Sequence, residues 1–240
     1  MLAGFVLGLA TLTRPVTLLF PVVLLAWILA TVESARKVKA LKTLGVVTIM
    51  MVMTILPWTI RNYVVTGSFV LVTSTDGLNF YIGHNPRANG DWVYMGDNDP
   101  VVSTLDPKAH KEGFRLGFQY LLSHPREEWN LFKIKQARFW GESSNWFIQV
   151  YAWEHRIPWI KPPTWAILAW IGTIVGLNRW HGSLLVVMFV LYYNALIVAV
   201  YYAPRYRLVV EPFWIILAVG GVAVALDRLG NLLAIKRNSG

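Results

Sequence analysis

Leu56-Pro57-Trp58-Thr59-Ile60-Arg61-Asn62-Tyr63 is the stretch in which a long apolar segment of the chain becomes polar. The 18 residues of Thr43–Ile60 carry no charge, and the run ends at Arg61. At about 1.5 Å per residue, a helix of this length covers roughly 27 Å, close to the hydrocarbon thickness of a bilayer. Trp58 and Arg61 stand where interfacial aromatic and cationic side chains are common. The stretch therefore predicts the outer end of a membrane-spanning helix.

The composition favours an all-α polytopic membrane protein. Hydrophobic residues make up 55% of the 240 residues, and several long runs carry no charge. Residues 61–161 hold 11 basic and 10 acidic side chains, so most of the net charge of +9 lies in short segments between apolar runs. That distribution is typical of the positive-inside rule and argues against a nucleic-acid partner. The absence of cysteine excludes disulfides and thiolate metal sites.

We expect three parts: an N-terminal transmembrane part (1–60), an extracytoplasmic domain (61–161), and a C-terminal transmembrane part with a cytoplasmic tail (162–240). The first part opens with an apolar run at 2–12 that is too short to span, so we expect a partial hairpin there. Because the chain begins inside apolar sequence, we expect it to be the later part of a larger protein or a short natural form. The predicted spans are 16–32, 43–60, 162–177, 183–203 and 208–226.

The extracytoplasmic domain is predicted to be small and either mixed α/β or mostly helical. Val64–Thr73 alternates in the manner of a strand, and Asn89-Gly90 is a tight-turn dipeptide. Two helices follow, one from Asp106-Pro107 to about Leu122 and one over about Arg126–Glu142. The second is predicted to gather Trp129, Phe132, Gln136 and Trp140 on one face, with Lys133, Lys135 and Arg138 mostly elsewhere. The pair either lies in the membrane plane or packs on the rest of the domain.

Candidate binding residues are cations on the predicted outer side. No catalytic motif of a soluble enzyme is present. Arg61 follows one span, and Pro204-Arg205-Tyr206-Arg207 joins two others. Arginine suits bidentate phosphate recognition, so Arg61, Arg205 and Arg207, with Tyr206, are candidates for a lipid phosphate. The alternative is that each arginine reaches for lipid headgroups and anchors its own helix.

Glu211 is the one acid inside a predicted span, and it lies four residues after Arg207. A helical turn would bring the two side chains together. We expect Arg207 to neutralise Glu211, in preference to a separate functional carboxylate.

Amide and aromatic side chains in the extracytoplasmic domain suggest a weaker site for sugar hydroxyl groups or an acceptor. The candidates are Asn79, Tyr81 and Asn85, around Gly83. No metal or cofactor is expected, because the possible metal ligands have irregular spacing and favour a solvated loop. Those possible ligands are His84, Asn85, Asp91, Asp97 and Asp99.

Four segments, in this order, resemble the later half of prokaryotic GT-C glycosyltransferases of the protein-mannosyltransferase-like group (family 39 type). The resemblance covers nearly the whole chain, and its second and third segments are the more specific. The segments are Gly4-x-x-x-Gly8-Leu9-Ala10-x-Leu12-Thr13-Arg14-Pro15, Pro57-Trp58-Thr59-Ile60-Arg61-Asn62-Tyr63, Gly77-Leu78-Asn79-x-Tyr81-Ile82-Gly83-x-Asn85-Pro86, and Arg205-Tyr206-Arg207 before Glu211-Pro212.

The resemblance implies a polytopic enzyme that transfers a sugar from a polyprenyl-phosphate carrier to an acceptor on the outer side of the membrane. The family's catalytic Asp lies in the first outer loop, and no position of this sequence matches it. We therefore expect a carrier-binding half that needs a preceding half for catalysis, with the lipid-linked sugar and membrane lipids as partners. The alternative is a non-catalytic polytopic membrane protein, either a transporter fragment or an assembly subunit.

Overall fold

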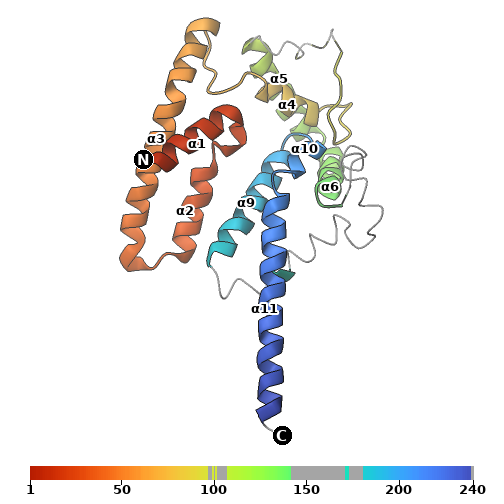
Figure 1. The fold of residues 1–240 in the computed structure, drawn as a ribbon. Helices are drawn as coiled ribbons and strands as arrows, with labels where there is room; N and C mark the ends of the chain where they lie inside the picture. Colours follow the sequence, from red (N-terminus) through yellow and green to blue (C-terminus); the bar gives the residue numbers. More distant parts are fainter. Residues whose placement is uncertain (97–98, 100, 102–106, 142–170, 173–180, 239–240) are drawn as a thin grey trace. The chain divides into compact units, whose positions relative to one another are not determined.

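The computed structural model describes the chain except for residues 97–98, 100, 102–106, 142–170, 173–180 and 239–240 (Figure 1). The described residues form two compact units, Met1–Lys135 with Tyr192–Tyr202, and Gln136–Leu191 with Ala203–Gly240. Ordered by sequence, the helical elements are α1 (Leu2–Thr13), η1 (Pro15–Thr17), α2 (Phe20–Thr31), α3 (Ser34–Thr66), α4 (Asp76–Gly83), α5 (Pro107–Ser123), α6 (Pro125–Gly141), α9 (His181–Val198), α10 (Pro204–Arg207) and α11 (Glu211–Asn238).

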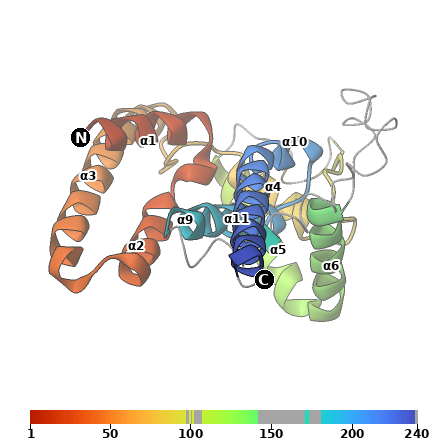
Figure 2. The same cartoon turned by 60° about the horizontal axis from the view of Figure 1, so that its bottom comes forward.

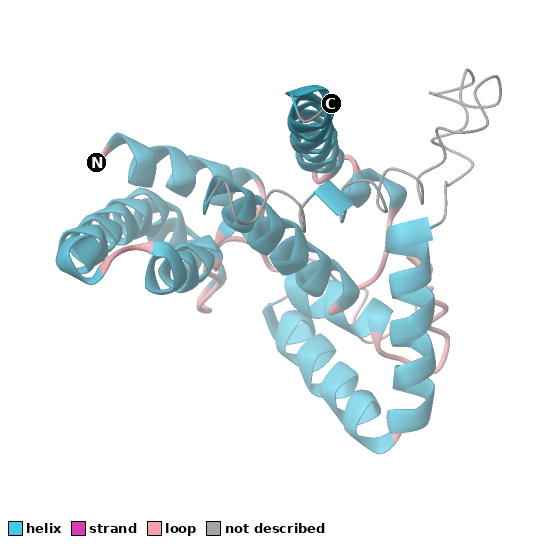
Figure 3. Cartoon of the chain, turned by 90° about the horizontal axis from the view of Figure 1, so that it is seen from below, coloured by secondary structure: helices cyan, strands magenta, loops and turns pink. Residues whose placement is uncertain are grey.

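The helical class is confirmed for the part of the chain that the structure describes. Those residues contain no strand, only an isolated bridge between Asp91 and Tyr202 (Figure 3). The prediction of a strand at Val64–Thr73 is wrong. Helix α3 continues to Thr66 and ends at Gly67, which has a φ of 65°. Beyond that glycine, the carbonyl groups of residues 70–72 accept hydrogen bonds from side chains of α3 and pair with no strand.

Helix α1 packs closely along α3, which explains the Gly4-x-x-x-Gly8 spacing (Figure 2). A Cβ atom added to Gly4 would lie 2.3 Å from the carbonyl oxygen of Val47. At Gly8 it would lie 2.5 Å from Cβ of Thr54. Small residues four apart allow this approach of two helix backbones. The predicted partial hairpin is thus a short helix that rests on α3.

Helix α3 is the one helix among the described residues that is long and apolar enough to cross a membrane. Its 33 residues measure about 50 Å, and the predicted span 43–60 lies inside it. Apolar side chains such as Ile49, Val52 and Met53 are more than half exposed. A bilayer would cover this surface, so the structure supports membrane association through α3. The multi-pass topology stays a prediction.

The two helices predicted in the extracytoplasmic domain are present as α5 and α6, although Asp106 lies outside the described residues. Trp129 and Phe132, on the predicted aromatic face of α6, do not pack on the rest of the domain, so the membrane-plane alternative stays open for them. Trp129 and Phe132 are 60% and 40% exposed, whereas Leu131, Lys135 and Phe139 are buried. The buried side of α6 is therefore a different stripe, Leu131, Lys135 and Phe139, with residues four apart and a lysine at its centre.

In the second unit, α10 occupies the turn that was predicted between the last two spans. The predicted spans 183–203 and 208–226 overlap α9 and α11, which are bounded by His181–Val198 and Glu211–Asn238. Trp214 of α11 stacks on Trp140, with ring centroids 4.8 Å apart. The predicted span 162–177 lies outside the described residues, apart from residues 171–172.

Candidate functional site

The Pro57–Tyr63 motif joins the last turns of α3 to the segment that follows. Nε1 of Trp58 donates a hydrogen bond to the carbonyl oxygen of Val72 at 2.9 Å, and Nδ2 of the buried Asn62 donates one to Val70 at 3.2 Å. Arg61 is exposed and its guanidinium lies 4.9 Å from the centre of the Trp58 ring. Trp58 and Asn62 therefore have structural roles, while Arg61 remains accessible to an anion.

The two arginines of α10 have different surroundings. Arg207 is buried, and its Nε lies 3.3 Å from Oε1 of Glu211, so the predicted pairing of these residues is confirmed. Its guanidinium also lies 5.4 Å from the centre of the Trp214 ring. Arg205 is exposed and lies 5.3 Å from the centre of the Tyr206 ring. Arg207 therefore fixes α10 on α11, and Arg205 presents its charge to the surroundings.

The predicted grouping of Arg61, Arg205 and Arg207 around one phosphate stays a prediction. Arg61 belongs to the first compact unit, and the other two arginines belong to the second. Within the second unit, Arg205 and Tyr206 are in contact, as a shared site requires.

The candidate sugar-binding residues lie on α4 and at its end. The amide of Asn85, which is 1% exposed, donates to the carbonyl oxygens of Tyr81 (2.8 Å) and Ile82 (3.0 Å) and accepts from the backbone nitrogen of Arg87 (2.7 Å). The side chain of Asn85 thus closes the C-terminus of α4. Asn79 and Tyr81 are half-buried, and burial raises the pKa of the Tyr81 hydroxyl, with a smaller contribution from Asp99.

A buried lysine that the sequence did not reveal joins two helix ends. Lys135 is 1% exposed, and its Nζ donates to the carbonyl oxygens of Gly83 (3.1 Å), Val198 (3.1 Å) and Val200 (2.7 Å). Gly83 is the last residue of α4 and Val198 the last of α9. An ammonium group has three donors, so all of them are used. One cation thereby caps two helix C-termini, where positive charge is favourable.

His84 and Glu128 extend this cluster. Nε2 of His84 lies 3.1 Å from the carbonyl oxygen of Ala199, and its Nδ1 lies 2.7 Å from Oε2 of Glu128. Because a carbonyl oxygen only accepts, Nε2 carries a hydrogen. The short contact at Nδ1 then requires a further proton, held by His84 or by Glu128. The pair is therefore an ionic or proton-sharing contact in the interior.

Two further contacts hold residues 198–202 against the end of α4 and the loop after it. A Cβ atom added to Gly83 would lie 1.7 Å from the carbonyl oxygen of Val200, so the two backbones are in close contact. The backbone nitrogen of Tyr202 donates to the carbonyl oxygen of Gly90 at 2.8 Å. Residues 198–202 are thus held within the first compact unit.

The prediction of a solvated loop is wrong for three of the possible metal ligands. His84 and Asn85 are buried, and the Asp99 side chain, 6% exposed, accepts a hydrogen bond from Nη2 of Arg87 at 2.9 Å. Asp97 lies outside the described residues. In the described ranges, no three His, Cys, Asp or Glu side chains are arranged to hold a metal ion.

The buried position of Lys135 predicts a dependence of stability on pH. Burial lowers its pKa to about 8, and the Glu128 carboxylate opposes this shift. The unfolded chain keeps the proton up to its ordinary pKa of 10.5, so between these values the unfolded state binds more protons. The free energy of unfolding should therefore rise with pH across this interval, by at most about 3 kcal/mol.

Denaturation of the wild-type protein from pH 7 to 10 in detergent, relative to Lys135→Met, tests this dependence. Subtracting the free energy of unfolding of Lys135→Met from that of the wild type at each pH cancels the contributions of the other titrating groups. A difference that does not change across the interval would show that Lys135 does not release its proton in the folded state.

We compared the chain with protein-family models, curated proteins and solved structures. No family model matches it, and neither a curated protein nor a solved structure gives a significant match. The functional assignment therefore depends on the residues of the chain itself.

Proposed function

We propose that this protein binds the phosphate of a polyprenyl-phosphate-linked sugar at the outer surface of a membrane and forms the carrier-binding half of a GT-C glycosyltransferase. The observation that carries the proposal is the arrangement of α10. Arg207 is buried against Glu211 and Trp214, while Arg205 is exposed beside Tyr206, just before the apolar first part of α11, Glu211–Val224.

This arrangement suits an anionic headgroup because one arginine stabilises the fold of the site and the other binds the ligand. The charge of Arg207 is balanced by Glu211, so Arg207 stabilises the fold of the site. The guanidinium of the exposed Arg205 rests against the Tyr206 ring, which limits its motion, and a guanidinium group suits bidentate binding of phosphate. Arg205 is therefore the principal phosphate ligand in this proposal, and Arg61 is a second candidate.

Helix α11 supplies a surface for the isoprenoid chain. Ile215, Val219 and Val222 are about half exposed or more, and their spacing of four and three residues places them on one stripe. The stripe begins just after α10, so a headgroup at Arg205 would leave its lipid chain beside these side chains. Burial of that apolar surface would add to the affinity for a lipid carrier over a free phosphate.

In the reaction that we propose, a base deprotonates the acceptor, and the bond from the sugar to the carrier phosphate breaks as the acceptor oxygen attacks. The departing phosphate gains negative charge, which the Arg205 guanidinium would stabilise. The base is assigned to no residue of this chain.

The replacement Arg205→Ala should weaken binding of polyprenyl phosphate by about tenfold or more, because one charge-assisted bidentate contact is lost. Arg205→Lys should retain part of the affinity, since lysine keeps the charge but not the planar geometry. Binding is measured on the full chain in nanodiscs with polyprenyl phosphate and, separately, with uncharged polyprenol.

Arg115→Ala is the matched control, because Arg115 is an exposed arginine of the other compact unit, where it pairs with Glu112 on α5. This control should bind polyprenyl phosphate like the wild type. Equal affinities of wild type and Arg205→Ala for the phosphate would reject Arg205 as its ligand. An equal loss for polyprenol would show that the variant damages the lipid-chain surface.

A further inference from the structure

An apolar surface lies around the corner between α5 and α6, where Phe118 packs on Phe80 and Phe114 and is still half exposed. We call it the hairpin surface and define it by four side chains that are 40–76% exposed: Phe118, Leu122, Trp129 and Phe132. All four belong to the first compact unit. Large apolar side chains gathered in this way mark an interaction site.

The corner between the two helices is short and is bridged by a side-chain hydrogen bond. Helix α5 ends at Ser123 and α6 begins at Pro125, and the Tyr120 hydroxyl donates a hydrogen bond to Oε2 of Glu127 at 2.8 Å. Burial and this carboxylate raise the pKa of Tyr120 to about 12, so the hydroxyl keeps its proton near neutral pH. The rings of Trp129 and Phe132 stack with centroids 5.2 Å apart. The apolar side chains are therefore presented in a fixed arrangement.

Basic side chains accompany the hairpin surface on both helices. Arg126, Trp129 and Lys133 share one stripe of α6, and both cations are exposed. Arg115 stands three residues before Phe118 on α5 and is also exposed. Without the buried Lys135, residues 107–141 contain six Lys or Arg and three Glu, a net charge of +3. This pattern, aromatic in the middle and basic beside it, complements an anionic lipid surface.

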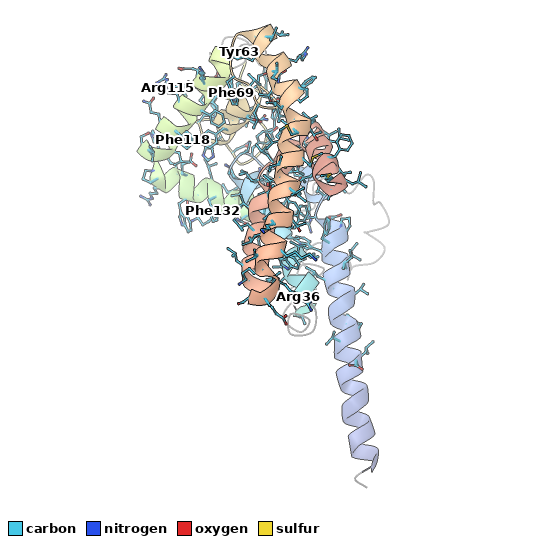
Figure 4. All side chains as sticks on the ribbon, turned by 90° about the vertical axis from the view of Figure 1, so that its left-hand side faces the viewer. Arg36, Tyr63, Phe69, Arg115, Phe118 and Phe132 are labelled. Carbon is cyan, nitrogen blue, oxygen red and sulfur yellow. The ribbon has the colours of Figure 1, made fainter. Side chains whose placement is uncertain are left out.

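The positions of Arg115, Phe118 and Phe132 relative to the axis of α3 agree with an anionic lipid surface as the partner. In Figure 4, Arg36 and Tyr63 mark the two ends of α3, and Phe118 and Phe132 lie nearer the Arg36 end than Arg115 does. The direction from Arg115 to Phe118 and Phe132 is therefore also the direction from the polar end of α3, near Tyr63, into its long apolar part. If the Tyr63 end of α3 is the outer end, Phe118 and Phe132 are thus on the bilayer side of Arg115.

We propose that the hairpin surface docks in the headgroup region of an anionic bilayer, with Phe118, Leu122, Trp129 and Phe132 inserted and with Arg126 and Lys133 bound to lipid phosphates. This inference uses the membrane association of α3 and is independent of carrier binding at Arg205. The docked corner fixes α5 and α6 relative to the membrane plane.

Depth-dependent fluorescence quenching tests the inference, and the absence of native cysteine makes the chain suitable. Single cysteines at Leu122→Cys and Phe132→Cys carry a fluorescent label in the full chain, in nanodiscs that contain phosphatidylglycerol. Spin-labelled lipids should quench these labels about three times more strongly than a label at Lys111→Cys, an exposed site on α5 about three turns from Leu122. Size-exclusion chromatography and circular dichroism confirm that each variant is folded.

The charge of the lipid provides a second readout. The double variant Arg126→Gln with Lys133→Gln should reduce quenching at Phe132→Cys in phosphatidylglycerol and have little effect in phosphatidylcholine alone. Quenching at Leu122→Cys and Phe132→Cys no greater than at Lys111→Cys would overturn the inference. Protection of both labels from lipid and aqueous quenchers in native membranes would overturn it too, because a protein would then cover the surface.

Discussion

Lys135→Met is expected to lower the free energy of unfolding by about 3 kcal/mol, which corresponds to a fall in Tm of about 6–12 °C. Methionine has a similar length but no donor, so three carbonyl groups at the ends of α4 and α9 lose their hydrogen bonds. Removal of the buried charge returns part of the cost of its burial. The loss should still dominate, because three buried acceptors would remain without a partner.

The matched control is Lys133→Met, two residues earlier on the same helix. Lys133 is exposed, so this replacement should change the free energy of unfolding by no more than about 0.5 kcal/mol. Thermal denaturation of both variants in detergent gives the comparison. Equal effects of the two replacements would mean that Lys135 does not hold α4 and α9 together.

Gly83→Ala is expected to destabilise the protein by about 3 kcal/mol or more. The added Cβ atom would lie 1.7 Å from the carbonyl oxygen of Val200 and 3.2 Å from Nζ of Lys135. The first of these contacts is with backbone, so no rotamer change relieves it. The segment that leads into α10 must move away, and the hydrogen bonds of Lys135 would lengthen.

Gly45→Ala serves as the control for replacement of a helical glycine. Nothing lies within 4 Å of a Cβ atom added to Gly45, and alanine stabilises a helix interior by about 0.5–1 kcal/mol relative to glycine. The Tm of this variant should therefore rise slightly, while that of Gly83→Ala falls. If Gly83→Ala were as stable as wild type, the close contact with Val200 would not exist in solution.

The sequence alone predicted the helical elements that depend on local signals. Asp106-Pro107 placed the start of α5, because proline fixes the first turn of a helix, and the predicted range of about Arg126–Glu142 agrees with α6 within a few residues. The four-residue spacing of Arg207 and Glu211 predicted their contact for the same kind of reason. The length of α3 was not predicted, because Arg61 looks like the end of a span although the helix continues to Thr66.

The Lys135 cluster could not be predicted, since its partners are 52 to 65 residues distant in the chain and are backbone carbonyl groups. One local signal was present. Leu131, Lys135 and Phe139 follow one another at intervals of four, which marks a buried stripe with a lysine in its middle. The competing stripe of Trp129 and Phe132 is richer in aromatic residues, and hydrophobicity alone favours it. The choice between the two faces depends on tertiary contacts.

The three-donor lysine also determines how the region can move. If the strip Val198–Tyr202 moves away from α4, the hydrogen bonds from Lys135 to Val198 and Val200 break together. A partial displacement of the strip therefore gains little conformational entropy and loses most of the energy of these hydrogen bonds. The strip and the end of α4 should consequently open as a single cooperative element, with matching rates of amide hydrogen exchange.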